Sequence, residues 1–390
     1  MGSRSPVLLV GIALVAVFAA AQVAVAARPT QAALQAVKSR ALSASRWSIV
    51  LPPTSSNGGS LRGVSCVSSS DCTAVGSSTE GTLVEDWDGV VWSTTSSPSP
   101  IRGGSGPDSS WLQAVSCVSA TDCIAVGADG DNYIAHTLAE RWNGTRWSVT
   151  HMPGPAGDSE LSGVSCASAT ACIAVGFAGN YSTLVERWNG SKWSVTHSAN
   201  PSGEDPTLDG VSCVSASDCT AVGSYFPGVG NDVDTLVEHW NGAVWSIIPS
   251  PNPAGGGADQ PELSGVSCVS ANDCTAVGAV GIDTTSTLVE HWNGSEWSVV
   301  PSPNTARGSS LRGVSCVSVK ECTAVGFTGS QNDYTLVEHW NGSKWSIIHS
   351  PNRDHGTSPT NILSAVSCVS ARRCTAVGIG DGSLVEQTGS

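Results

Sequence analysis

Three observations predict that this chain is an all-β protein built as a closed ring of seven similar four-stranded units. One string, Val-Ser-Cys-x5-Cys-x-Ala-Val-Gly, recurs seven times along the 390 residues. A second string, Trp-Asn/Asp-Gly-x-x-Trp, follows it in six of the seven units. The runs between them are short, rich in Val, Thr and Trp, and bounded by Gly, Asn, Pro and Ser, as strands are. Four such strands in a repeat of about 50 residues are typical of a β-propeller, here with seven blades.

The fifth unit illustrates the four expected strands of a blade. We expect them over 263–269, 274–280, 287–292 and 296–301. Asn293-Gly294 predicts a two-residue hairpin turn between the third and fourth strands, because Asn and Gly tolerate the positive φ that such a turn needs. After the N-terminal segment, no long stretch of the sequence shows the apolar period of a helix.

The two ends of the chain supply complementary parts of one blade. The seventh unit stops after Leu384-Val385-Glu386 and lacks the second string. Near the N-terminus, Arg46-Trp47-Ser48-Ile49-Val50 matches the fourth strand of the other units. We therefore expect the N-terminal strand to complete the last blade, which closes the ring and removes an open sheet edge. The propeller is expected to span residues 46–390.

The first residues are interpreted as an export signal. Arg4 precedes an uncharged apolar run over 7–27 that ends in Ala24-Val25-Ala26, as in a cleaved signal peptide. We assign 1–27 to the signal peptide and 28–45 to a linker. The same run is long enough to cross a bilayer, so retention as an anchor is the alternative. With cleavage, the protein is expected to be secreted, monomeric and without a membrane span.

Fourteen cysteines form seven Cys-x5-Cys pairs, one in each unit. In an exported chain, an even number at constant spacing predicts disulfides. Zinc, the alternative, usually takes closer cysteine spacing with further ligands nearby, and no His recurs beside these pairs, so no metal site is expected. The expected disulfides are Cys66–Cys72, Cys117–Cys123, Cys166–Cys172, Cys213–Cys219, Cys268–Cys274, Cys316–Cys322 and Cys368–Cys374.

A glutamate occupies one repeated place before the second string. With a two-residue turn, Glu140 would face Trp147 and its carboxylate could accept the indole N–H of a buried Trp. A single active site does not need the same acid in all seven blades, so we interpret this position as structural. The alternative is a ring of equivalent ligand sites. The seven residues are Glu85, Glu140, Glu186, Glu238, Glu290, Glu338 and Glu386.

Composition and motifs limit the function classes. The net charge of −14 argues against nucleic acid, which clustered Lys and Arg bind. No nucleophile–base pair, phosphate-binding loop or His-Glu-x-x-His motif is present, although propeller enzymes assemble their sites from separate blades. We interpret the protein as a secreted binding or scaffold protein rather than an enzyme, with an extracellular protein or glycan as its partner. A carbohydrate-binding lectin is the alternative, followed by a glycan-directed hydrolase or lyase.

The expected ligand site lies on the face that we call the variable-loop face, onto which the strand two–three loops and the blade-to-blade loops open. The opposite turn face carries the repeated turns. All Tyr residues fall in strand two–three segments, beside Asp and Asn; aromatic planes with such side chains suit sugars, and functional residues commonly lie on variable loops. The run over 129–132 also offers oxygen ligands for calcium, the one cofactor considered. Simple turn formation is the alternative. The candidates are Tyr133, Tyr181, Tyr225, Phe226, Tyr334, Asp129, Asp131, Asp232 and Asp333.

The turn Trp87-Asp88-Gly89-Val90-Val91-Trp92 resembles the Asp-box, Ser-x-Asp-Gly-x-x-Trp, of sialidase-like propellers. In that family the box joins the third and fourth strands of a blade, which is where it is expected here. Five of the six turns have Asn in place of Asp, and none has the leading Ser in register. The resemblance implies a propeller with structural turns and no particular chemistry, since the Arg-Ile-Pro segment of sialidases is absent. The Ala-Val-Gly strands also resemble photosystem assembly-factor-like propellers, and the whole chain resembles uncharacterised secreted repeat proteins of actinobacteria.

Overall fold

The computed structural model describes residues 1–2, 47–53, 58–100, 109–130, 134–155, 157–179, 181–228, 233–253, 260–281, 285–329, 333–353 and 360–389. The chain divides into two units, Met1–Ser43 and Ala44–Ser390. Apart from residues 1–2, the predicted signal peptide and linker lie outside the described residues, so the fold below is that of the second unit. No helix in the described part of the chain is long and apolar enough to cross a membrane.

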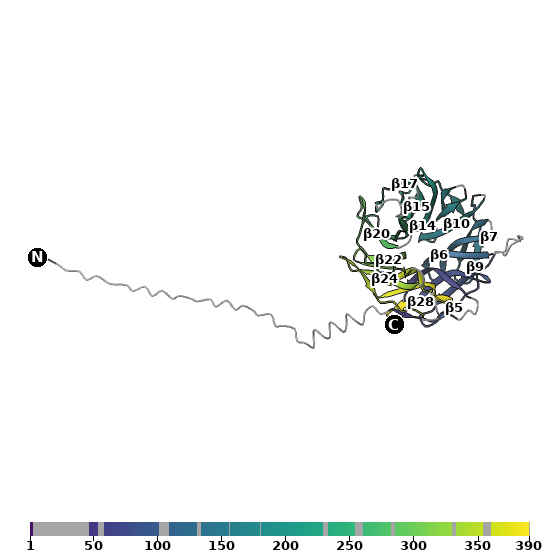
Figure 1. The fold of residues 1–390 in the computed structure, drawn as a ribbon, viewed down its shortest axis with the longest axis horizontal. Helices are drawn as coiled ribbons and strands as arrows, with labels where there is room; N and C mark the ends of the chain where they lie inside the picture. The colour runs from purple at the N-terminus through teal and green to yellow at the C-terminus, as the bar shows by residue number, and fades with distance from the viewer. Residues whose placement is uncertain are drawn as a thin grey trace. The chain divides into compact units, whose positions relative to one another are not determined.

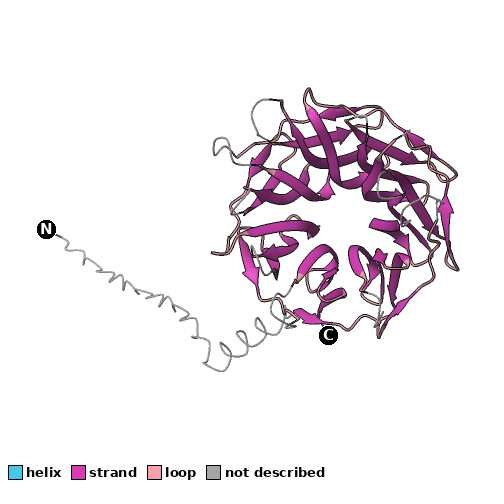
Figure 2. Ribbon diagram, turned by 45° about the vertical axis from the view of Figure 1, so that its right-hand side comes forward, coloured by secondary structure: helices cyan, strands magenta, loops and turns pink. Residues whose placement is uncertain are grey.

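Seven four-stranded sheets form the blades of a ring (Figures 1 and 2), which confirms the predicted seven-bladed propeller. Strand is the only regular structure in the described ranges. Blade 1 consists of β2–β5, and each later blade of the next four strands, until blade 7 combines β26, β27 and β28 with β1.

The bounds of the strands repeat from blade to blade. The innermost strands are β2 (Ser60–Ser68), β6 (Ser109–Ser119), β10 (Ser159–Ser168), β14 (Glu204–Ser215), β18 (Glu262–Ser270), β22 (Ser309–Ser318) and β26 (Ile362–Ser370). The second strands are β3 (Asp71–Ser78), β7 (Asp122–Gly130), β11 (Ala171–Ala178), β15 (Asp218–Phe226), β19 (Asp273–Val280), β23 (Glu321–Thr328) and β27 (Arg373–Ile379). The third strands are β4 (Gly81–Trp87), β8 (Ala135–Trp142), β12 (Ser182–Trp188), β16 (Asp234–Trp240), β20 (Ser286–Trp292), β24 (Tyr334–Trp340) and β28 (Ser383–Thr388). The outermost strands are β5 (Trp92–Thr94), β9 (Trp147–Thr150), β13 (Trp193–Val195), β17 (Trp245–Ile247), β21 (Trp297–Val299), β25 (Trp345–Ile348) and β1 (Trp47–Ile49).

The N-terminal strand closes the ring, as predicted. β1 pairs antiparallel with β28, with Trp47 opposite Thr388 and Ile49 opposite Glu386. The Val50 N–H extends the ladder by donating to the Val385 carbonyl at 2.9 Å. Trp47 is 4% exposed and belongs to the core of blade 7. Closure therefore buries a large aromatic side chain as well as pairing a strand edge.

A second ring of hydrogen bonds joins the innermost strands. In every blade the serine of Val-Ser-Cys accepts the backbone N–H of the first cysteine in the next blade, for example Ser65 from Cys117 at 3.0 Å. The last bond runs from the Cys66 N–H to Ser367, across the closure. The repeated Ser thus has a structural role, since it fastens each blade to the following one.

Each innermost strand carries the same β-bulge. In blade 1 the register shifts between Leu61 and Gly63, which leaves Arg62 unpaired. The bulge brings the Ser60 carbonyl against the second strand, where a Cβ built on Gly76 would lie 1.9 Å from that oxygen. The Gly of Ala-Val-Gly is therefore required by a close backbone approach.

The cysteines form the seven predicted disulfides, each within its own blade. Each bond joins directly opposed residues of the first and second strands, as for Cys66 and Cys72. The apolar core consists of seven clusters of Leu, Val, Ala, Cys and Trp side chains that combine residues of adjacent blades.

The turn between the third and fourth strands is longer than the predicted two residues. Trp142 pairs directly with Trp147, so four residues lie between them. The Asn143 side chain accepts the N–H groups of Thr145 and Arg146 at 3.0 Å, and Gly144 takes the positive φ. An Asn that caps its own turn favours this four-residue loop over the tighter hairpin.

The predicted bond between the glutamate and the indole N–H is wrong. The indole N–H of Trp147, the predicted partner of Glu140, has no hydrogen-bond partner among the described residues. The Trp142 N–H reaches the strand one–two turn and donates to the Ala120 carbonyl at 3.1 Å. The glutamate shares the face of the Trp pair but accepts a serine hydroxyl from the preceding blade instead, for example Ser198 to Glu238 at 2.6 Å. All seven glutamates are 0% exposed.

Two blades lack this serine. The preceding blades offer Pro52 to Glu85 and Met152 to Glu186 at the equivalent place. Neither glutamate accepts a hydrogen bond of normal geometry at its carboxylate oxygens. The nearby Ser383 hydroxyl partly lowers the pKa of Glu85. The Thr137 hydroxyl does the same for Glu186. Burial dominates and raises the pKa of both carboxyls to about 7.

Candidate ligand site at the channel mouth

The central channel opens on the variable-loop face beside the first residues of the innermost strands. Ser60, at the start of β2, pairs with Ser77 near the end of β3, so this end of the strand lies beside the strand two–three loop. A cavity of about 480 Å³ opens here and is lined by residues from all seven blades. We call this cavity the channel mouth.

Each blade contributes its bulge residue to the channel mouth. The side chain stands between a buried Leu that anchors the strand and a Gly or Ala that packs against the next blade; a Cβ on Gly63 would lie 2.9 Å from the Ala114 Cα. Bulges commonly direct a side chain toward a site in this way. The seven residues are Arg62, Gln113, Ser162, Asp209, Ser264, Arg312 and Ser364.

Hydrogen bonds link three blades on one side of the mouth. The Arg62 guanidinium donates to the Gln113 side-chain oxygen at 2.9 Å. The Gln113 amide donates to Glu160 at 2.8 Å, and the Trp111 indole N–H donates to the same carboxylate oxygen at 2.9 Å. The chain of donors and acceptors fixes these side chains across the blade boundaries.

Asp209 lies on the other side, in a cluster of charges. Burial, with a smaller contribution from the Glu262 carboxylate, raises the pKa of Asp209 to about 7. The Thr207 hydroxyl, 3.4 Å from the carboxylate, and the Arg312 guanidinium act in the opposite direction. Asp209 can therefore gain or release a proton near neutral pH, which is a property of general acids and bases.

Arg312 connects the mouth with the loops. Its guanidinium lies over the Phe327 ring, 5.4 Å from the centroid. It also lowers the pKa of the predicted site residue Asp333, against a larger rise caused by burial. Asp333 is half-buried and forms an isolated bridge with Thr360 of the next blade-to-blade connection.

The structure places the described Tyr residues of the predicted site on separate blades. Tyr181 has 73% of its surface exposed and a φ of 60°. Tyr225 is half-buried, with its hydroxyl 3.4 Å from Asp234, and the adjacent Phe226 is 39% exposed. Tyr334 is half-buried beneath Arg307, whose guanidinium lies 5.0 Å from the ring centroid.

The other predicted site residues divide into two groups. Asp129 is 2% exposed and lines a cavity of about 480 Å³ beside His136 and Met152 at the edge of blades 2 and 3. Tyr133, Asp131 and Asp232 lie outside the described residues, so the suggested calcium ligands over 129–132 remain a prediction. Among the described residues, no group of three or more His, Cys, Asp or Glu could hold a metal ion.

The residues of the channel mouth were not predicted. They follow from aligning the seven repeats, because the two positions that flank the constant Leu change from blade to blade. These pairs read Ser60 and Arg62, Trp111 and Gln113, Glu160 and Ser162, Thr207 and Asp209, Glu262 and Ser264, Ser310 and Arg312, and Ile362 and Ser364. Variation at one place of a near-constant strand is the signal that could have found them.

No protein-family model and no curated protein matches the chain. Solved structures with a similar fold include YCF48 bound to D1 peptide, with 11% identity, a TM-score of 0.54, and 88% of this chain and 97% of that chain covered. YCF48 from Cyanidioschyzon merolae has 15% identity and a TM-score of 0.52, with 88% and 98% covered.

A third similar structure is a polysaccharide lyase, an ulvan lyase bound to a GlcA–Rha3S saccharide. It has 10% identity and a TM-score of 0.57, with 85% of this chain and 94% of that chain covered. At such identities the three likenesses establish the β-propeller fold alone. The narrower resemblance to Asp-box propellers and to actinobacterial secreted proteins stays a prediction.

Proposed function

We propose that this protein is a secreted binding protein whose ligand enters the channel mouth on the variable-loop face. The observation that carries the proposal is the convergence on one cavity of seven bulge residues, which are two Arg, three Ser, one Gln and one Asp. The neighbouring positions of the same strands are nearly constant, so the bulges are variable points on a rigid scaffold. Seven disulfides favour an oxidising compartment outside the cytosol.

The chemistry of the mouth suits a polar, hydroxyl-rich ligand. The guanidinium groups of Arg62 and Arg312 line the mouth together with the Asp209 and Glu262 carboxylates and four serines. Such a mixture supplies donors and acceptors in close alternation, which sugar hydroxyls can match in both directions. A glycan is therefore the preferred ligand, and a polar segment of an extracellular protein is the other partner to test.

A glycan array probed with the oxidised protein tests the proposal. Arg62→Ser and Arg312→Ser are suitable variants, because Ser occupies the same bulge in three blades and the fold accommodates it. Each variant should bind the glycan with about tenfold lower affinity, which is the effect of losing one charge-assisted hydrogen bond. Lys192→Ala and Glu296→Ala, in turns of the opposite face, serve as controls and should bind like the unchanged protein.

Two results would overturn the proposal. One is the absence of binding both to the array and to a peptide array of polar sequences. The other is a bound ligand whose affinity is unchanged in the Arg62→Ser/Arg312→Ser double variant.

A glycan-directed hydrolase or lyase is the second candidate, and the raised pKa of Asp209 favours it. Burial holds the pKa of Asp209 at about 7, where a carboxyl can act as acid or base. Neutral and uronate-containing polysaccharides should then acquire new chain ends, and Asp209→Ser should abolish this activity while keeping the fold. Binding without cleavage would exclude the enzyme and leave the binding protein.

A further inference from the structure

The ring departs from its own repeat at the closure, on the turn face. In six blades the third strand ends in a Trp that lies 5.6–5.9 Å, centroid to centroid, from the Trp opposite. In blade 7 the residue opposite Trp47 is Thr388. The Thr388 hydroxyl accepts the Cys374 N–H at 2.9 Å and donates to the Arg372 carbonyl at 3.1 Å. The backbone groups are thus satisfied, and the missing indole leaves a cavity of about 200 Å³ beside Trp47, between blades 6 and 7.

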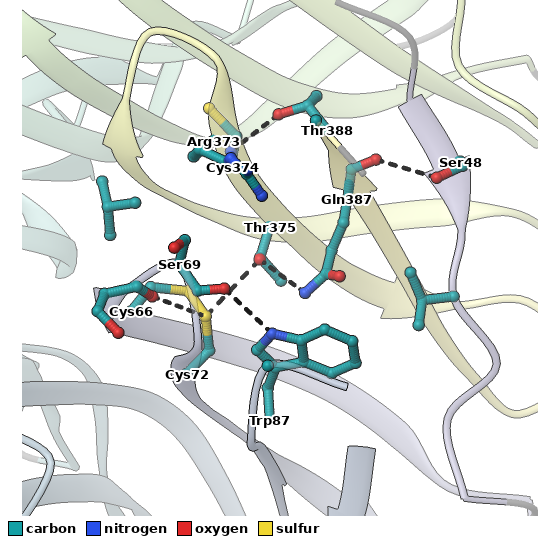
Figure 3. Close-up of a pocket in the computed structure, with 15 residues that line it drawn as sticks. Ser48, Cys66, Ser69, Cys72, Trp87, Arg373, Cys374, Thr375, Gln387 and Thr388 are labelled. Atoms are coloured by element: carbon teal, nitrogen blue, oxygen red, sulfur yellow. Dashed lines mark hydrogen bonds between the residues drawn. A yellow bond between two sulfur atoms is a disulfide. The ribbon is translucent and has the colours of Figure 1, made fainter. Parts of the chain in front are cut away.

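A second cavity, of about 240 Å³, lies on the opposite face of blade 7, between this blade and blade 1 (Figure 3). Gln387 and Thr375 of blade 7 border it on one side, and Trp87 of blade 1 on the other. We call this cavity the closure pocket. It is smaller than the roughly 300–1,000 Å³ of pockets for drug-sized ligands, so it suits one small ring.

Trp87 offers a flat apolar surface to the closure pocket. Its indole N–H donates to the Ser69 carbonyl at 3.2 Å and Trp92 packs 5.8 Å away, so the ring is held in place. In blades 3 and 4 the arginine before the preceding Trp covers the equivalent indole: Arg141 lies 5.8 Å from Trp188, and Arg187 lies 5.9 Å from Trp240.

In blade 7, Gln387 occupies the position that this arginine has in blades 2 and 3. Its amide is turned to blade 7, where it donates to the Thr375 hydroxyl at 3.2 Å. Trp87 is therefore not covered by a guanidinium from the preceding blade, in contrast to Trp188 and Trp240.

The electrostatics of the closure pocket favour an anion. Arg373 is the one charged residue among those that line it, although the chain as a whole has a net charge of −14. Within the described ranges, the Arg373 guanidinium makes neither an ion pair nor a hydrogen bond of standard geometry. Its planar donor group matches a carboxylate in two parallel hydrogen bonds.

We propose that the closure pocket binds one carboxylated pyranose, with its apolar C–H face on Trp87 and its carboxylate on Arg373. The Gln387 side-chain oxygen is positioned to accept a sugar hydroxyl. This site lies on the turn face and does not depend on the channel mouth, so the two can be tested separately.

Titration of the oxidised protein with methyl β-glucuronide, followed by calorimetry and Trp fluorescence, tests the proposal. Methyl β-glucoside is the matched neutral probe and should bind about tenfold more weakly, because it lacks the charge-assisted hydrogen bonds. Arg373→Gln should weaken glucuronide binding by a similar factor. Arg372→Gln makes the same change of charge at the neighbouring exposed residue, which does not line the closure pocket, and should leave binding unchanged.

One further variant restores the repeat of blades 2 and 3 in blade 7. Gln387→Arg places a guanidinium over Trp87, as Arg187 lies over Trp240. It should abolish glucuronide binding despite its added positive charge. The change is made at a half-buried surface position, so the fold should accommodate it.

The proposal is overturned if methyl β-glucuronide does not bind to the oxidised protein. It is also overturned if the glucoside binds equally well, or if Gln387→Arg and Arg373→Gln both retain the affinity of the unchanged protein. Binding that disappears in Arg62→Ser/Arg312→Ser, rather than in these variants, would assign the sugar to the channel mouth instead.

Discussion

The turn face and the variable-loop face are built from the same strands, yet they differ in how strictly the repeat is kept. On the turn face, the Asn-capped loop, the Trp pair and the disulfide recur almost without change. On the variable-loop face, the residues on either side of the constant Leu form five different pairs among the seven blades. The difference indicates that the repeated residues hold the ring together, whereas the candidate binding residues occupy the positions that depart from the repeat. The closure pocket supports this view, because it is the point where the turn face itself departs from the repeat.

The largest effect is expected from removing the strand that completes the ring. Deletion of residues 43–53 takes away β1, exposes the edge of β28 and removes the buried Trp47. An unpaired edge pairs with other chains, so the truncated protein should aggregate and lose its cooperative melting transition. Size-exclusion chromatography and calorimetry measure both effects. A monomer with an unchanged melting temperature would contradict the role given to the closure.

Reduction of the disulfides should have the next largest effect and should act on the turn face. In the chain-entropy model each small loop contributes about 2 kcal/mol, so reduced protein should melt at a clearly lower temperature. Intact mass should fall by about 14 Da on oxidation, since each bond removes two hydrogens. Peptide mapping that found cysteines paired between blades would disprove the assignment within blades.

The buried glutamates predict that the protein is more stable in mild acid than in mild alkali. Burial raises the pKa of Glu140, Glu186 and Glu290 from 4.5 to about 7, and of Glu386 to about 8. A raised pKa means that the folded state holds the proton more tightly than the unfolded state. The stabilising contribution is therefore complete below about pH 4.5 and is lost as the pH rises through 7 to 8. The melting temperature should be higher at pH 5 than at pH 8.5.

Glu186→Gln separates this effect from general charge. Glu186 has no serine partner, and its carboxylate must ionise without hydrogen bonds of normal geometry. The unchanged protein should lose on the order of 1 to 3 kcal/mol more free energy of unfolding than the variant when the pH is raised from 5 to 8.5. The exposed residue Glu296 provides the control, and Glu296→Gln should leave the pH dependence unaltered.

The smallest effects concern the aromatic residues of the variable-loop face. Once a ligand of the channel mouth is known, alanine at Tyr133, Tyr225 and Tyr334 should each weaken binding by about 1 kcal/mol, as is usual for interface aromatics. Titration calorimetry measures the change. Affinity lost in Lys192→Ala and Glu296→Ala instead would transfer the function to the turn face.

The fold could be predicted because it depends on repeated local signals. Seven copies of one string establish the number of blades, and the missing fourth strand at one end matches Trp47 at the other. The turn length was predicted incorrectly because Asn-Gly is compatible with a two-residue hairpin, whereas the Asn143 side chain stabilises a longer loop. The serine partner of five buried glutamates could not be predicted either, since it comes from the preceding blade.

The candidate site was harder to predict because its residues are far apart in sequence. Arg62, Asp209 and Arg312 meet only after the ring has closed, and each stands in a strand that otherwise looks structural. The bulge that turns them into the channel depends on a backbone register that no single repeat reveals. Tyr and Asp residues in loops were more conspicuous, and the structure distributes the described ones over blades 2, 3, 4 and 6.

The closed ring of Ser–Cys hydrogen bonds has a consequence for the order of the blades along the chain. The bond between Cys66 and Ser367 has the same length, 3.0 Å, as the six within the covalent sequence. The junction of blades 7 and 1 is therefore equivalent, in these bonds, to every other junction. Trp47 at the start of β1 lies opposite Thr388 at the end of β28. In a chain that begins at Trp47, a short linker could therefore join these two strand ends, and new ends could be opened in another blade-to-blade loop. Such circular permutants should retain the propeller, because the fold does not depend on which blade comes first in the chain.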